Sequence, residues 1–117
     1  MQNNKIFSMS IFSKEDEKIA EVFKALGHPS RLWIVKRLSS GEQPAGAFVA
    51  GLRVDFSTVS QHLSVLKRAG VIESHKRGQH VFYSLVYPCI PWLIERMEYR
   101  DRLFEKGQLG DIGCPGH

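Results

Sequence analysis

The chain has 117 residues, of which 43% are hydrophobic and 24% are charged, and 16 basic against 12 acidic side chains give a formal net charge of +4. This length suits one domain, and the apolar content is too high for a disordered chain. The longest apolar-rich stretch, residues 81–94, contains two prolines and is shorter than the roughly 20 residues of a membrane helix. Composition therefore excludes a disordered, fibrous or membrane-spanning protein.

The cysteines and the first residues indicate the compartment. Cys89 and Cys114 are too far apart for a short metal-binding or disulfide motif, which fits a reducing environment. The apolar patch at residues 6–12 runs directly into charged residues, unlike a signal peptide. We expect a cytoplasmic protein without a membrane segment.

Two helices are predicted after an N-terminal arm of residues 1–12. Ser13 is a suitable N-cap, apolar side chains recur at helical spacing, and Gly27 ends the pattern. Pro29 opens a second helix, which closes at residues 39–41. We expect the folded domain to span residues 13–106 and a flexible tail to span residues 107–117.

The middle of the chain predicts two more helices and a hairpin. A weak helix runs from Pro44 through Ala50, and Asp55 caps a fourth helix whose inward positions are Val59, Leu63 and Leu66. Strands are predicted at residues 71–74 and 80–85, with a basic tip at residues 75–79. A last helix starts at Pro88 or Pro91 and ends near Lys106. The order predicts a mainly α fold with a small β-hairpin wing, a winged helix-turn-helix.

The fourth helix carries the pattern of a DNA-reading element. Its exposed side chains are small and polar, and no acid occurs in residues 57–71. Such side chains reach base edges and phosphates, whereas acids would be repelled by phosphate. The alternative is an ordinary solvated face. The candidate contacts are Ser57, Thr58, Ser60, Gln61 and His62.

The predicted wing adds basic charge. Lys76 and Arg77 lie beside Gly78, and residues 53–80 hold five Lys and Arg side chains against two acids. Basic hairpin tips contact phosphates or the minor groove, although a charged tip also serves simply as a soluble turn. Together with the fourth helix, the pattern favours DNA as the partner.

Three ordered motifs resemble the ArsR-type (arsenical-resistance repressor) family of bacterial regulators. They are FKALGHPSRL at residues 23–32, STVSQHLSVLKRAGVI at residues 57–72, and KRGQ at residues 76–79 followed by YSL at residues 83–85. The resemblance implies a homodimeric repressor that binds a palindromic operator in double-stranded DNA and releases it when an inducer binds. It also implies DNA contacts at the helix and wing positions given above, and dimerisation through the first and last helices.

The apolar stripes of those two helices agree with this implication, and two half-sites suit a two-fold symmetric protein. The expected dimerisation residues are Ile19, Val22, Phe23, Ile90, Leu93, Ile94, Met97 and Phe104.

The inducer site departs from the patterns of the family. The Cys-x-Cys of arsenite-sensing members is absent, and the last helix has Asp101 but no His, so the zinc site is doubtful too. Cys89 is expected at the start of the last helix, where the helix dipole raises thiol reactivity. Our hypothesis pairs Cys89 of one subunit with Cys114 of the other, as a site for trivalent arsenic or another soft metal ion, or as a disulfide in a redox- or sulfide-responsive repressor. The alternative is a buried Cys89 and an incidental Cys114.

Two other functions predict sequence patterns that differ from this one. A winged helix that serves only as a protein-interaction module, without an inducer site, predicts an acidic recognition face, which this chain lacks. An enzyme is not expected, because the sequence has no Gly-rich phosphate loop, paired carboxylates or metal-ligand spacing.

Overall fold

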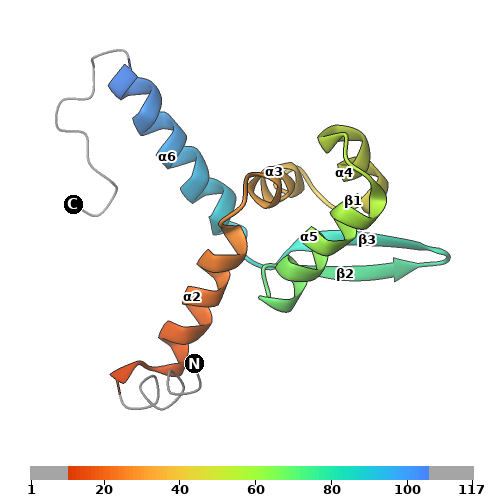
Figure 1. Ribbon diagram of the computed structural model, residues 1–117, viewed down its shortest axis with the longest axis horizontal. Coiled ribbons are helices and arrows are strands. Elements are labelled where there is room, and N and C mark those ends of the chain that lie inside the picture. Colours follow the sequence, from red (N-terminus) through yellow and green to blue (C-terminus); the bar gives the residue numbers. More distant parts are fainter. Residues whose placement is uncertain (1–10, 106–117) are drawn as a thin grey trace. The chain divides into compact units, whose positions relative to one another are not determined.

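The computed structural model describes residues 11–105, and the described residues form two units that divide after Val86. The first unit contains α2 (Lys14–Leu26), α3 (Pro29–Leu38), β1 (Gln43–Pro44), α4 (Ala45–Leu52), α5 (Phe56–Arg68), β2 (Ile72–Arg77) and β3 (His80–Leu85). The second unit contains α6 (Cys89–Glu105) (Figure 1). The predicted fold class, mainly α with a β-hairpin wing, is confirmed.

The helix starts follow the capping chemistry read from the sequence. The backbone N–H of Asp16 donates to the Ser13 hydroxyl at 3.0 Å, so Ser13 caps α2. His28 caps α3, because its Nδ1 accepts from the Ser30 N–H at 3.0 Å. Only two residues, Gly27 and His28, separate the helices. A link this short restricts the path of the chain between α2 and α3.

The core of the first unit holds α5 in place. The inward positions Val59, Leu63 and Leu66 are at most 3% exposed, as the spacing predicted. They share the core with buried side chains from α3, from α4, from the residue before β2 and from its first residue, namely Ile34, Val35, Leu38, Phe48, Val71 and Ile72. Burying a large aliphatic or aromatic side chain contributes about 1.5–3 kcal/mol. One face of α5 is therefore fixed and the opposite face is presented outward.

The sheet has one strand more than the sequence predicted. Gln43 and Pro44 form β1, which pairs antiparallel with Tyr83 and Phe82 of β3, and the strand order is β1-β3-β2. The prediction of a helix starting at Pro44 was wrong by one residue, because Pro44 has an extended backbone and α4 begins at Ala45. α4 runs to Leu52, beyond the predicted end, and Arg53 follows with φ of 58°.

The hairpin is longer than predicted and its turn is tighter. β2 continues to Arg77, which pairs with His80, so the loop consists of Gly78 and Gln79 alone. Gly78 has φ of 63°, which favours glycine at the first position of a two-residue hairpin loop. Lys76 and Arg77 therefore lie on the strand next to the turn, not in a loose tip. In Figure 1 the hairpin extends away from α5.

The last helix begins at Cys89, between the two predicted starts, and ends at Glu105. Ile90 is its buried residue, whereas Trp92, Met97 and Phe104 are more than half exposed. In the part of the chain that is described, no helix is long and apolar enough to cross a membrane.

Candidate nucleic-acid interface

The amino end of α5 is fixed by its cap. Asp55 accepts hydrogen bonds from the Thr58 N–H at 2.9 Å and from the Ser57 hydroxyl at 3.3 Å. Hydrogen bonds from the side chain and backbone of Thr58 hold the pKa of Asp55 below its ordinary value. The one acid at this end of α5 is thus engaged by the helix itself, as the sequence predicted.

The outward face of α5 consists mainly of small polar side chains. Ser57, Ser60 and Gln61 are exposed, and Thr58 is half-buried beside the cap. Within α5 itself there is no acidic residue. Short hydroxyls and an amide on a fixed helix are suited to contacts with phosphates and base edges.

His62 has a different environment from these residues. Its ring is half-buried and its centroid lies 4.6 Å from that of His28. The Nη1 of Arg31 lies 3.3 Å from the Nδ1 of His62. Burial is the largest cause that lowers the pKa of His62, and the positive charges of His28 and Arg31 lower it further. Its side chain therefore joins α5 to the start of α3, which the sequence pattern did not indicate.

Phe56 was missed by the sequence analysis. It is the first residue of α5 and is 61% exposed. A Phe side chain can make apolar contact with a thymine methyl group. The signal was present as an aromatic residue between a capping Asp and a run of small polar residues.

The two basic residues of the wing differ in their interactions with the rest of the protein. The Arg77 guanidinium lies 2.6 Å from the Glu42 carboxylate and 5.2 Å from the centroid of the Phe82 ring. Lys76 is exposed and has no ion pair with another described residue. Lys67 of α5 donates to the Ser74 hydroxyl of β2 at 2.7 Å, which joins α5 to the wing. Lys76 is thus the cation available to a partner.

The expected dimerisation residues fall into two groups. Val22 and Ile90 are buried, at 8% and 7% exposure. Ile94 is half-buried. The remaining five expose 37% to 67% of their surface, namely Ile19, Phe23, Leu93, Met97 and Phe104. These five are accessible to a partner surface.

The expected sensing residues are only partly visible. Cys89 is exposed at the first residue of α6, so the prediction of a helix-start position is confirmed and the alternative of a buried thiol is wrong. Cys114 lies outside the described residues. Within residues 11–105, no group of three or more His, Cys, Asp or Glu side chains could hold a metal ion.

Known proteins are similar to this chain in fold and in sequence. The profile of a helix-turn-helix domain family matches residues 26–75. An HTH-type transcriptional regulator of Methanocaldococcus jannaschii is 41% identical over 83 residues, covering 70% of this chain and 93% of that protein. The transcriptional repressor SdpR of Bacillus subtilis is 39% identical over 77 residues, covering 62% of this chain and 86% of SdpR. The structure of HlyU from Vibrio cholerae superposes with a TM-score of 0.66 at 31% identity, over 75% of this chain and 96% of HlyU.

The chain belongs to the ArsR-type family of winged helix-turn-helix transcriptional regulators. Its relatives include a named repressor, and the matched family is a DNA-binding one. This ArsR-type regulator therefore has a non-enzymatic, DNA-binding role in transcription. In this fold the hairpin of β2 and β3 is the wing.

Proposed function

We propose that this ArsR-type regulator is a homodimeric repressor that reads a palindromic operator in double-stranded DNA. The observation that carries the proposal is the outward face of α5, which is fixed by the core, capped by Asp55 and free of acids. The proposed contacts are Ser57, Thr58, Ser60 and Gln61 on α5, and Lys76 on the wing. We do not assign direct contacts to His62 and Arg77, because their side chains are held by other residues of the protein.

The exposed apolar residues support a dimer. Ile19 and Phe23 are 53% and 57% exposed on one face of α2, and Met97 and Phe104 are 61% and 67% exposed on α6. Exposed apolar side chains grouped on helices mark protein interaction surfaces. A second copy buries them and supplies the second recognition helix, which a site with two half-sites about 34 Å apart requires.

The inducer in this proposal is thiol-reactive. The exposed Cys89 at the start of α6 supports it, since thiols at helix amino ends are reactive. Trivalent arsenic or another soft ion would bind thiolates of Cys89 and of Cys114 from the partner subunit, or oxidation would join the two as a disulfide.

A mobility shift on the DNA upstream of the regulator's own gene tests the proposal. We expect a specific complex that arsenite, cadmium or an oxidant dissociates, and that persists under the same treatment in Cys89→Ser and Cys114→Ser variants. Release of both variants by arsenite and by oxidant, equal to that of the unmodified chain, would remove the thiol inducer and leave the DNA-binding role. Equal binding of random duplex would instead favour a protein-interaction module.

A further inference from the structure

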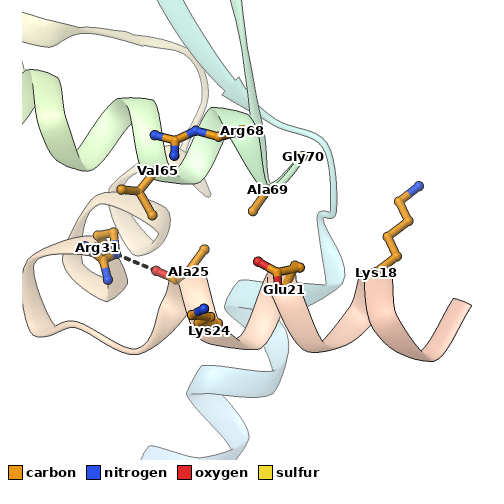
Figure 2. A pocket seen from close by; sticks show the side chains of 9 residues that line it. All are labelled: Lys18, Glu21, Lys24, Ala25, Arg31, Val65, Arg68, Ala69 and Gly70. Atoms are coloured by element: carbon orange, nitrogen blue, oxygen red, sulfur yellow. Dashed lines mark hydrogen bonds between the residues drawn. The ribbon is translucent and has the colours of Figure 1, made fainter. Parts of the chain in front are cut away.

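A hollow of about 500 Å³ lies in the first unit between α2, α3 and the carboxyl end of α5 (Figure 2). Small-molecule sites in proteins have volumes of roughly 300 to 1,000 Å³. Figure 2 shows α2 along one edge of the hollow and the end of α5 along the other. None of the proposed DNA contacts or dimerisation residues lines it. The hollow therefore has the volume of a ligand site. The function proposed above does not use it.

Positive charge dominates its lining. Four cationic side chains and one carboxylate surround the hollow, namely Lys18, Lys24, Arg31, Arg68 and Glu21. Among residues 11–105, no hydrogen bond or ion pair engages the side chains of Lys18, Lys24 or Arg68. A concave surface with several unpaired cations attracts anions. The expected occupant carries a negative group.

The inner wall of the hollow is apolar. Ala25 of α2 is buried, and Val65 and Ala69 from the end of α5 are half-buried. An inorganic anion would satisfy the cations and leave this wall in contact with water. An organic anion with a short apolar chain would cover both.

Arg31 joins the hollow to the recognition helix. Its Nε donates to the carbonyl oxygen of Ala25 at 2.5 Å, and its Nη1 lies 3.3 Å from the Nδ1 of His62 on α5. An anion that attracts the guanidinium competes with His62 for the same group. Occupation of the hollow therefore alters the attachment of α5 to α3.

We propose that this hollow binds a small organic carboxylate with a short apolar chain, and that binding through Arg31 lowers the affinity of α5 for DNA. The binding step is independent of the proposed repressor function, whereas the second step rests on it. The site is also separate from the proposed dimer surface. At about 100° per residue, Ile19 and Phe23 lie between about 100° and 160° around α2 from Lys18, Glu21 and Ala25.

The binding step is tested on the full chain without DNA. Hexanoate is the probe, hexanol is its uncharged counterpart, and inorganic phosphate supplies charge without an apolar chain. Binding is measured by calorimetry and by amide shifts in NMR spectra. We expect hexanoate to shift the amides of Ala25, Ala69 and Gly70 at millimolar concentration, and hexanol and phosphate to bind at least about tenfold more weakly.

Three variants separate charge from shape. Lys18→Gln/Lys24→Gln removes two cations of the hollow, and Lys14→Gln is the matched control because Lys14 lies on the same helix but does not line the hollow. Ala69→Leu fills the hollow without changing its charge. Hexanoate binding should weaken about tenfold or more in the double variant and in Ala69→Leu, and should be unchanged in Lys14→Gln.

Three results would overturn the assignment of a carboxylate site: no hexanoate binding at millimolar concentration, equal binding of hexanol or phosphate, or equal loss in Lys14→Gln. The coupling is then measured as the effect of hexanoate on DNA affinity. We expect weaker DNA binding in the unmodified chain and no such effect in Ala69→Leu, and bound DNA should weaken hexanoate binding by the same factor. Hexanoate binding that leaves DNA affinity unchanged contradicts the coupling alone. A chain that binds hexanoate but no DNA contradicts the proposed repressor function.

Discussion

Arg77 on the wing forms an ion pair with Glu42, which precedes β1, at 2.6 Å. The two residues are 35 positions apart in the sequence, and the pairing of β1 with β3 brings them together. One of the two basic residues that the sequence assigns to DNA is therefore engaged within the protein. This leaves Lys76 as the exposed, unpaired cation of the described hairpin next to its turn.

Substitution of these three residues should separate the roles of the two cations. Lys76→Gln should weaken binding to all DNA sequences about equally and reduce the slope of affinity against salt by about 1, because one phosphate contact is lost. Arg77→Gln should change that slope less. Glu42→Gln should strengthen DNA binding, because it removes an acid and frees Arg77. Fluorescence anisotropy over a salt series measures all three. If Lys76→Gln and Arg77→Gln reduce the salt dependence of DNA affinity equally, and Glu42→Gln does not strengthen DNA binding, then Arg77 contacts DNA despite its ion pair.

Gln61 should act on specificity. Gln61→Ala should weaken the free energy of binding to the operator by about 1–3 kcal/mol, because an amide that bridges an adenine edge is lost. Random duplex should bind as before. Competition binding with operator variants measures both quantities, and Lys76→Gln serves as the control that weakens all sequences. A Gln61→Ala variant with the operator preference of the unmodified chain would place base reading elsewhere on α5.

The half-buried position of His62 predicts a pH dependence of stability. Its pKa is lowered from an ordinary value of 6.5, first by burial and then by the charges of His28 and Arg31. Just below pH 6.5 the unfolded chain therefore binds more protons at this residue than the folded chain, so stability falls as pH falls. Asp55 titrates below its ordinary value of 3.8 and does not contribute in this range. Urea unfolding at about pH 7.5 and about pH 5.5 should show a smaller loss of stability in His62→Gln than in the unmodified chain. Equal losses would exclude His62 as a cause.

Two glycines of α4 offer a matched test of packing. A Cβ on Gly51 would clash with the ring of Trp33, whereas a Cβ on Gly46 would meet nothing within 4 Å. Gly51→Ala should therefore destabilise the fold by about 1–3 kcal/mol. Gly46→Ala should stabilise it by about 0.4–1 kcal/mol, because it lowers the entropy of the unfolded chain. Chemical denaturation measures both. Destabilisation by both variants to the same extent would argue against the packing of Trp33 on Gly51.

Phe23 tests the proposed dimer surface. It is 57% exposed, so Phe23→Ser should leave the fold of the subunit largely intact and weaken self-association. Val81→Ser is a suitable control, since Val81 is 40% exposed on the wing. Sedimentation velocity should show a dimer for the unmodified chain and for the control, and monomers for Phe23→Ser at the same concentration. A Phe23→Ser dimer of unchanged stability would move the interface away from this face of α2.

The parts of the fold that the sequence predicted depend on local chemistry. The Ser13 and Asp55 caps and the inward stripe of α5 are set by residues within three or four positions of one another. Strand β1 was missed because two residues give no period to detect, and its backbone hydrogen-bonding partner lies on β3.

The sequence predicted which residues the candidate site contains, but it did not predict all of their interactions. The exposed positions of Ser57, Ser60 and Gln61 follow from the helical period. The engagement of His62 by Arg31 and of Arg77 by Glu42 could not be predicted, because each pair joins residues more than 30 positions apart through tertiary packing. The hollow between α2 and α5 could not be predicted either, because tertiary packing brings its lining residues together from distant parts of the sequence.

Sequence-specific DNA binding by two recognition helices is the central claim. The most direct measurement compares the affinity of the unmodified chain for three duplexes at physiological salt: the palindromic operator, the same duplex with one half-site scrambled, and a random sequence. We predict that the operator binds at least about 10³-fold more tightly than the random duplex, and that scrambling one half-site removes most of this preference. Equal affinity for all three duplexes would contradict it.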